Sequence, residues 1–152
     1  PSRLWNRKGG TDMTNKLPGG CTLVDLAIRG DDRGSLIALE GKRSLPFAVA
    51  RVYYVFGTQP GVSRGFHAHR KLNQLAVAVS GSCMMLVDDG RRRTSVRLDV
   101  PNKGLLLGPM LWREMHEFSP DCVLLVMADT PYDESDYIRD YQAFLREVRA
   151  AA

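Results

Sequence analysis

Short apolar stretches separated by turn residues constrain the fold of this chain more than any other feature of its sequence. Each stretch has the length of a β-strand, and Gly, Pro, Asn and Asp fill the gaps between them. The predicted strands cover residues 22–27, 35–40, 48–56, 65–71, 74–80, 82–88, 95–98, 104–107 and 123–128. Many short strands in a chain of 152 residues indicate an all-β sandwich or a closed barrel.

The two ends of the chain differ from this pattern. Apolar side chains recur at helical spacing near the C-terminus, which predicts a short helix over about residues 137–150. Residues 1–20 contain Gly-Gly and Pro-Gly pairs and little apolar periodicity, so we expect a flexible tail or a remnant of expression there. Residues 21–152 are expected to form a single domain.

The composition excludes several classes of protein. The chain is 44% apolar and 25% charged, as globular proteins are. No apolar run approaches the roughly 20 residues of a membrane helix, and no segment resembles a secretion signal. The three cysteines have unrelated spacings, which predict neither a disulfide framework nor a zinc site. Cys83 and Cys122 lie in apolar runs and are expected to be buried thiols, so we predict a cytoplasmic protein without a membrane partner.

The charge of the chain is mildly basic, with a formal net charge of +4. Its densest basic run, Arg91-Arg92-Arg93, directly follows Asp88-Asp89-Gly90, which is a strong hairpin-turn signal. A solvated hairpin tip explains this run. A nucleic-acid surface would need more basic residues interleaved with aromatic ones, so we expect no nucleic-acid partner. The mild basic excess suits a small substrate that carries phosphate.

His67 and His69 are the strongest candidates for chemistry. Residues i and i+2 of a strand face the same way, so both imidazoles are expected to point into one space. Such a pair indicates either a metal site or acid–base catalysis, because imidazole titrates near neutral pH. Two hydrogen-bonded structural histidines are the alternative, which the adjacent Arg64 and Gly65 make less favourable.

A metal site would need ligands that the surrounding sequence does not supply. Metal-binding cupins continue from His-x-His to a Glu and then to a Gly at a fixed distance. Here Gln74 stands in the Glu place and Gly81 in the Gly place, and a neutral amide is a much poorer ligand for a divalent cation than a carboxylate. The stretch at residues 109–114, which matches the second cupin motif, lacks both its Gly and its His. We therefore expect no metal and no cofactor.

The residues around the pair resemble a known family. Arg64-Gly65-Phe66-His67 is similar to the Arg-Gly-x-His motif of the dTDP-4-keto-6-deoxy-sugar epimerases, which are metal-free cupins. The chain resembles the sugar 3,4-ketoisomerase (WxcM-like) family more closely, over residues 22–144. The matching blocks include Asp32-Arg33-Gly34-Ser35-Leu36, Leu45-Pro46-Phe47, Arg51-Val52-Tyr53-Tyr54, Arg64-Gly65-Phe66-His67-Ala68-His69, Gln74, Gly81-Ser82, Tyr132-Asp133-Glu134 and Asp136-Tyr137-Ile138-Arg139. Arg113 departs from the pattern, because many relatives have His after the Trp.

This resemblance implies a fold, a substrate and a reaction. The fold is an all-β cupin, or jelly roll (double-stranded β-helix), with a short C-terminal helix. The substrate is a dTDP-linked keto-sugar, dTDP-4-keto-6-deoxyglucose, and the product is a dTDP-3-keto-6-deoxyhexose. The chemistry suits histidine, since the C4 ketone acidifies the C3 hydrogen, a base forms the enediol, and protonation at C4 completes the shift. Exposed strand edges and the resemblance both favour a homodimer.

The candidate site residues follow from the motif and from strand alternation. We assign His67 as the first-choice base, with His69 as its partner and Tyr53 as a further catalytic candidate. In the related epimerases the Arg of the motif meets the nucleotide phosphates, and a guanidinium fork suits a diphosphate, so Arg64 is expected to bind there. The other expected substrate-binding residues are Arg51, Tyr54, Gln74, Trp112 and Arg113. For the tyrosines and the Trp, ordinary packing is the alternative.

Two other functions remain open from the sequence. One is a dTDP-sugar 3,5-epimerase, which uses the same base but protonates a carbon from the opposite face. The other is a non-catalytic cupin that binds a nucleotide sugar.

Overall fold

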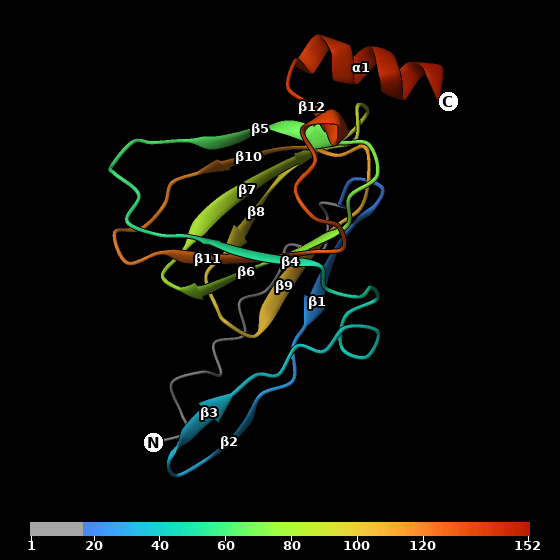
Figure 1. The fold of residues 1–152 in the computed structure, drawn as a ribbon. Coiled ribbons are helices and arrows are strands. Elements are labelled where there is room, and N and C mark those ends of the chain that lie inside the picture. Colours follow the sequence, from blue (N-terminus) through green and yellow to red (C-terminus); the bar gives the residue numbers. More distant parts are fainter. Residues whose placement is uncertain (1–16) are drawn as a thin grey trace.

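The computed structural model describes residues 17–152, which form two five-stranded sheets and a projecting hairpin (Figure 1). The first sheet has the order β1 (Cys21–Asp25), β9 (Lys103–Leu107), β6 (Gln74–Ser80), β11 (Val123–Ala128), β4 (Arg51–Val55). The second has the order β12 (Tyr137–Ile138), β5 (Arg64–His69), β10 (Trp112–His116), β7 (Cys83–Asp88), β8 (Arg93–Leu98). The hairpin of β2 (Arg29–Asp31) and β3 (Gly34–Leu36) extends away from both sheets in Figure 1.

The chain passes back and forth between the two sheets. From β4 it crosses to β5, returns to β6, crosses again to the β7–β8 hairpin, and continues in this way through β9, β10, β11 and β12. All pairings between these strands are antiparallel. This alternation is the topology of a jelly roll. The predicted all-β fold with a short C-terminal helix is therefore confirmed.

The largest core cluster lies between the sheets. The central strands β6 and β11 read as nearly continuous apolar runs, as expected for strands that are covered on both faces. The buried residues include Ala76, Met85, Leu105, Leu107, Leu111, Leu124 and all three cysteines. The predicted burial of the Cys83 and Cys122 thiols is thus confirmed, and burial raises the pKa of the Cys83 thiol to about 12.

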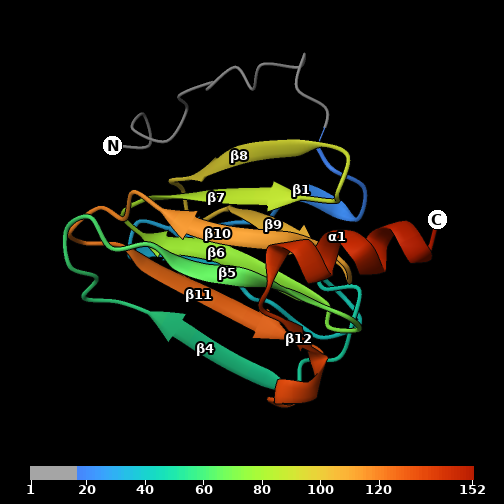
Figure 2. The same ribbon diagram turned by 90° about the horizontal axis from the view of Figure 1, so that it is seen from above.

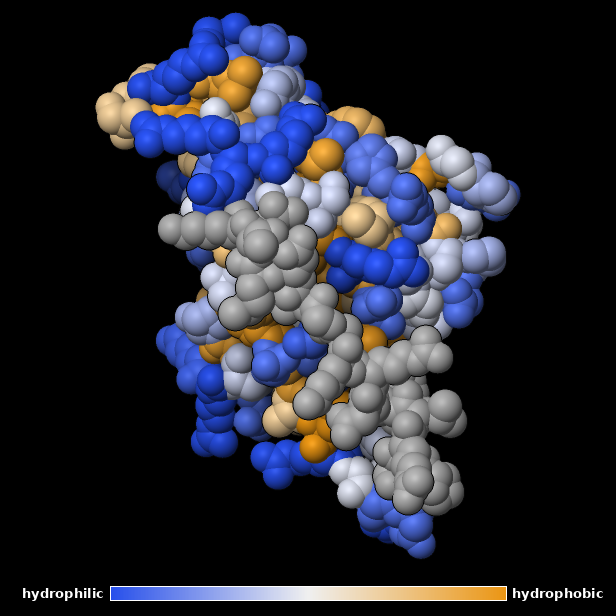
Figure 3. Space-filling view, turned by 180° about the vertical axis from the view of Figure 1, so that it is seen from behind, coloured by the Kyte–Doolittle hydropathy of each residue, from blue (hydrophilic) through white to orange (hydrophobic). Residues whose placement is uncertain are grey.

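The C-terminal helix, α1 (Tyr141–Ala150), begins later than the sequence pattern predicts. Residues 137–138 pair with His69 and Ala68 of β5, and the Asp140 side chain then caps the helix by accepting a hydrogen bond from the Ala143 amide. The helix lies above the second sheet (Figure 2) and buries Phe144 against Trp112, Ala68 and Ile138. Its outward side is mostly hydrophilic, with apolar side chains beneath (Figure 3).

Other expectations about the chain have clear outcomes. The Asp88-Asp89-Gly90 turn does join β7 to β8. Strands β2, β10 and β12 were not predicted. Of the expected tail, residues 1–16 lie outside the described part, and the Gly20 carbonyl accepts a hydrogen bond from the Gly108 amide. Within residues 17–152, the structure contains no helix that is both long enough and apolar enough to cross a membrane.

Candidate active site

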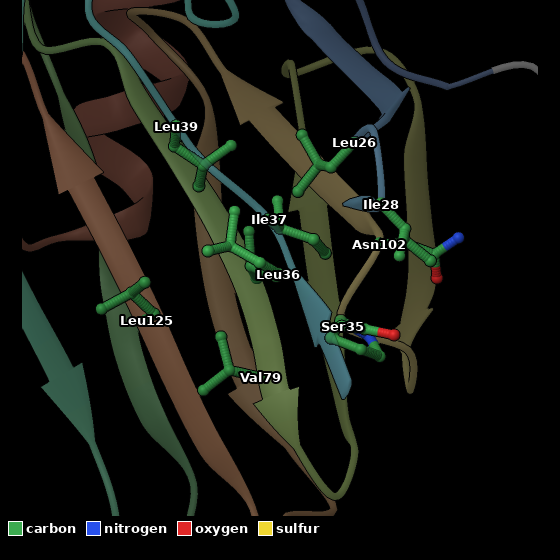
Figure 4. A pocket seen from close by; sticks show the side chains of 11 residues that line it. Leu26, Ile28, Ser35, Leu36, Ile37, Leu39, Val79, Asn102 and Leu125 are labelled. Atoms are coloured by element: carbon green, nitrogen blue, oxygen red, sulfur yellow. The ribbon is translucent and has the colours of Figure 1, made fainter. Parts of the chain in front are cut away.

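A cavity of about 350 Å³ opens between β4, β5, β10 and the segment around β12. Four of the predicted site residues line it, namely Arg51, Tyr53, Arg64 and His67. Tyr137 and Arg139, which the sequence analysis did not assign to a site, also line it. Another cavity, of about 310 Å³, lies between the residues after β1 and the first sheet (Figure 4). Its lining is mostly apolar, with Ser35 and Asn102 as the polar side chains and no titratable one. The cavity beside His67 is the candidate active site, because it brings four of the predicted site residues together.

The two histidines of β5 point to the same side of their strand, as predicted. Their ring centroids are 4.9 Å apart and their planes nearly perpendicular, at 85°. The Tyr137 ring lies against both, 4.9 Å from the ring of His67 and 4.3 Å from that of His69. His67 lines the cavity, whereas His69 is only 1% exposed and lies deeper. The pair thus has one member that a substrate can reach and one behind it.

The strand that carries the pair has an irregular backbone at its entry. Gly65 has φ +91°, and a Cβ at this position would lie 3.0 Å from the Arg113 carbonyl oxygen. The pairing of β5 with β10 shifts register at Arg113/Glu114, opposite this point. Glycine is therefore required here, because a side chain would be both strained and too close to β10.

Asp136 holds His69 through its ring nitrogen Nδ1. The distance from Nδ1 to Oδ2 of Asp136 is 3.2 Å, and the other carboxylate oxygen accepts a hydrogen bond from the Lys71 amide at 2.8 Å. Nδ1 of His69 is therefore the protonated nitrogen when the ring is neutral, and its Nε2 carries the lone pair. That Nε2 is buried and has no hydrogen-bond partner among the described residues.

Arg70 fastens the segment that carries Asp136 and Tyr137. Its guanidinium donates hydrogen bonds to the Ser135 and Tyr137 carbonyls, at 2.8 and 3.0 Å, and also pairs with Glu147 of α1. The Arg70 amide donates to the Asp136 carbonyl. Helix α1 and β5 are thereby tied to the same short segment, which fixes Asp136 beside His69.

Tyr53, Gln74 and Arg113 form a hydrogen-bonded chain behind the cavity. Gln74 donates from Nε2 to the Tyr53 hydroxyl at 3.3 Å, and its Oε1 accepts a hydrogen bond from Nη1 of Arg113 at 2.5 Å. Gln74 and Arg113 are each 2% exposed and neither lines the cavity. Arg113, which departs from the family pattern, therefore lies behind the residues that line the cavity.

Two predicted binding residues lie away from the cavity. Tyr54 is 61% exposed, because alternation along β4 turns it to the side opposite Tyr53. Trp112 is buried under α1, where its ring packs on those of Tyr141 and Phe144 and its Nε1 donates to Glu114.

The site is electropositive. Arg51, Arg64 and Arg139 line the cavity, and among residues 17–152 only Arg139 of these three has a carboxylate partner, Glu134 at 2.6 Å. Burial, followed by the charge of Arg113, lowers the pKa of His67 to about 4. The same two causes also lower the pKa of His69, in spite of the Asp136 carboxylate. Both imidazoles are neutral at pH 7, and a neutral imidazole is what a base requires.

Comparison with known proteins identifies the family. The family model described as "WxcM-like, C-terminal" matches residues 19–149. The chain belongs to this family. A TDP-4-oxo-6-deoxy-alpha-D-glucose-3,4-oxoisomerase from Aneurinibacillus thermoaerophilus is 49% identical over 118 residues, which are 78% of this chain and 85% of that protein. The family resemblance expected from the sequence is thus confirmed.

Solved structures of this family superpose closely on the chain. A 3,4-ketoisomerase from Helicobacter canadensis has a TM-score of 0.83 at 44% identity, covering 85% of this chain and 97% of that one. A variant of the 3,4-ketoisomerase QdtA from Thermoanaerobacterium thermosaccharolyticum, in complex with TDP-4-keto-6-deoxyglucose, has a TM-score of 0.86 at 35% identity. It covers 88% of this chain and 97% of its own.

Proposed function

We propose that this protein is a sugar-nucleotide 3,4-ketoisomerase that moves the carbonyl of dTDP-4-keto-6-deoxyglucose from C4 to C3. The observation that carries the proposal is the convergence of His67 and Tyr53 at one electropositive cavity, with His69 directly behind His67, in a member of this family. The relatives named above are 3,4-keto- or oxoisomerases, and one was solved with TDP-4-keto-6-deoxyglucose.

The reaction needs two proton movements at carbon. His67 removes the proton from C3, since it lines the cavity and its depressed pKa keeps it unprotonated at pH 7. The electrons form the C3–C4 double bond of an enediol, and the C4 oxygen takes up a proton. The C3 hydroxyl then loses its proton as the carbonyl forms at C3, and C4 takes up a proton. The oxidation state changes only within the sugar, so the reaction needs no redox cofactor.

Other residues bind the substrate or stabilise the negative charge that develops on it. Tyr53 donates its hydroxyl proton to a sugar oxygen where negative charge develops. Arg64, with Arg51, pairs with the diphosphate, because guanidinium forks match phosphate oxygens. His69 acts behind His67, with Asp136 fixing its tautomer.

We propose that the reaction proceeds without a metal, on the basis of the donor set. His69 commits Nδ1 to Asp136, and Gln74, which stands in the ligand place, commits its oxygen to the Arg113 cation. Residues 17–152 contain no group of three or more His, Cys, Asp and Glu side chains placed to hold an ion. Turnover that disappears on dialysis against a chelator and returns with added Fe, Mn or Zn would contradict this.

We further propose a cytoplasmic homodimer built from the single domain of residues 21–152. The β2–β3 hairpin is fully exposed, and a lone two-stranded hairpin is marginally stable in water. Leu36 on this hairpin and Tyr54 and Phe56 at the β4 edge expose large apolar surface that a second copy can cover. Sedimentation equilibrium tests this, because a monomer at micromolar concentration would contradict it.

An NMR time course with dTDP-4-keto-6-deoxyglucose in D₂O tests the function. The proposal expects the ketone carbon signal to move from C4 to C3 with deuterium appearing at C4. Deuterium at C5 would instead indicate an epimerase. Binding of the nucleotide sugar with no turnover would indicate a non-catalytic binding protein.

A further inference from the structure

Arg113 is a buried cation with no direct ion-pair partner among residues 17–152. It lies on β10, where its Cα pairs with that of His67 on β5, and it is 2% exposed. Its guanidinium donates to the Leu111 carbonyl from Nε and Nη2, at 3.3 and 3.0 Å, and to Oε1 of Gln74 from Nη1. These acceptors are all neutral, and within residues 17–152 the structure has no ion pair that includes Arg113.

Such an arrangement is unfavourable for stability. Taking a charge out of water carries a large free-energy cost, and proteins normally offset it with a paired opposite charge. Burial lowers the pKa of Arg113 to about 10, so the side chain is still a cation at neutral pH. Several ionisable groups interact electrostatically with Arg113. They are Cys21 on β1, Tyr53 on β4, the two histidines of β5, and Asp136 with Tyr137 at β12.

Gln74 keeps this charge from being cancelled. It has the size of a glutamate and accepts the Arg113 hydrogen bond as a carboxylate would, but it adds no negative charge. Because its oxygen faces Arg113, its Nε2 must face the Tyr53 hydroxyl, which accepts that hydrogen bond. The proton of the hydroxyl is then left to donate elsewhere, and Tyr53 lines the cavity.

We propose that Arg113 is a positioning residue whose positive charge stabilises the enediolate oxygens of the substrate. It does so by polarising the hydrogen-bonded chain from Gln74 to Tyr53. The same charge holds His67 in its basic form. This inference rests on the proposed ketoisomerase function. A fixed positive charge in a site of low polarity stabilises developing negative charge without reorganisation of solvent. Besides Arg113, the charged groups that act on His67 are Arg139 and Glu134, and these two neutralise each other in an ion pair.

Replacement of Gln74 by Glu tests this with almost no change of shape. Glu pairs with Arg113 and cancels its charge, so the variant is expected to fold. We expect kcat to fall roughly 10- to 100-fold with KM changed less than about threefold, as a charge a few ångströms away in a protein interior predicts. The acid limb of kcat/KM should move up by about one to two pH units, since His67 loses a neighbour that disfavours its protonation.

Two further measurements complete the test. NMR titration of the His67 imidazole should show the same upward shift of its pKa in the Gln74→Glu variant, and this readout does not depend on turnover. Arg113→Gln removes the charge without adding a carboxylate and should give the same shift and loss. The control is Arg97→Gln on β8, which removes one exposed charge from an ion pair with Asp99 and should leave kcat and the titration unchanged.

The outcomes separate this inference from the proposed function. A wild-type protein that does not convert dTDP-4-keto-6-deoxyglucose contradicts the function, while the imidazole titration still reports on the charge of Arg113. Wild-type turnover together with an unchanged kcat and an unchanged acid limb in Gln74→Glu overturns the inference alone. An Arg113→Gln variant that folds and keeps wild-type kcat overturns it as well.

Discussion

Replacing Asp136 with Asn is the sharpest test of how the deeper histidine is held. Two donors converge on this carboxylate, namely Nδ1–H of His69 on Oδ2 and the Lys71 amide on Oδ1. Asn has the same shape but only one acceptor oxygen, and its other group is a donor. In one of the two contacts a donor of the Asn amide would therefore face another donor, unless the His69 ring changes its tautomer.

The structure gives the size of both effects. A buried donor left without a partner costs about 1–3 kcal/mol, and for a domain of this size that lowers Tm by roughly 3–10 °C. If the Asn amide faces His69, the ring moves its proton to Nε2, which in the wild type is buried and holds the lone pair. We then expect kcat to fall on the order of 100-fold, at the lower end of what a positioned acid–base group supplies.

Thermal unfolding, the NMR time course of carbonyl migration and ¹⁵N NMR of the imidazoles measure these effects. The control is Asp133→Asn on the same segment, where Oδ1 accepts hydrogen bonds from the amide and hydroxyl of Ser135 and Asn can still do so. The reasoning is refuted if Asp136→Asn keeps the wild-type tautomer of His69 together with wild-type kcat and Tm.

Three other perturbations have defined outcomes. His67→Asn should lower kcat by about 10²–10⁴-fold at nearly constant Tm, and turnover within tenfold of wild type would remove His67 as the base. Gly65→Ala should cost about 1–2 kcal/mol in chemical denaturation, because φ is +91° and the new Cβ meets the Arg113 carbonyl; unchanged stability would contradict this. Acid should destabilise the fold, because below the ordinary histidine pKa of 6.5 the unfolded chain binds protons that buried His67 and His69 do not. Each histidine should lower the free energy of unfolding by about 1.4 kcal/mol per pH unit below pH 6.5. The contribution of His67 to this fall ends near pH 4, and that of His69 continues below it. Urea unfolding at pH 7 and pH 5 measures this, and equal stabilities would argue against neutral buried imidazoles.

Much of the fold follows from patterns that the sequence carries locally. β6 and β11 were predicted with their observed bounds, because both are apolar runs between clear turn residues. β10 was missed, since its sequence places Arg113 and Glu114 at the centre of the strand, and Arg113 is buried through a hydrogen bond to a residue far away in sequence. The helix was predicted to start too early, because pairing of Tyr137 with β5 outweighs its helical spacing.

The candidate site shows the same division. The convergence of His67 and His69 follows from strand alternation alone. The sequence offered Asp136 only as part of a matching block and not as a site residue. Its contact with His69 spans 67 positions in the chain and depends on the hydrogen bonds from Arg70 to the carbonyls of Ser135 and Tyr137. The sequence alone does not show which of the neighbouring Tyr53 and Tyr54 side chains faces the cavity. In the structure Tyr53 lines it, and Tyr54 lies on the opposite side of β4.

Position 74, where metal-binding cupins have Glu, holds Gln in this chain. A carboxylate at this place suits a divalent cation, which brings positive charge to the site. In this chain the same place holds a neutral amide, and the positive charge comes from Arg113, which is bonded to that amide at 2.5 Å. A guanidinium polarises the site without an open coordination position, so any proton transfer must be carried by the side chains. His67, with a pKa of about 4, and the hydroxyls of Tyr53 and Tyr137 are groups at the cavity that the chain offers for this purpose.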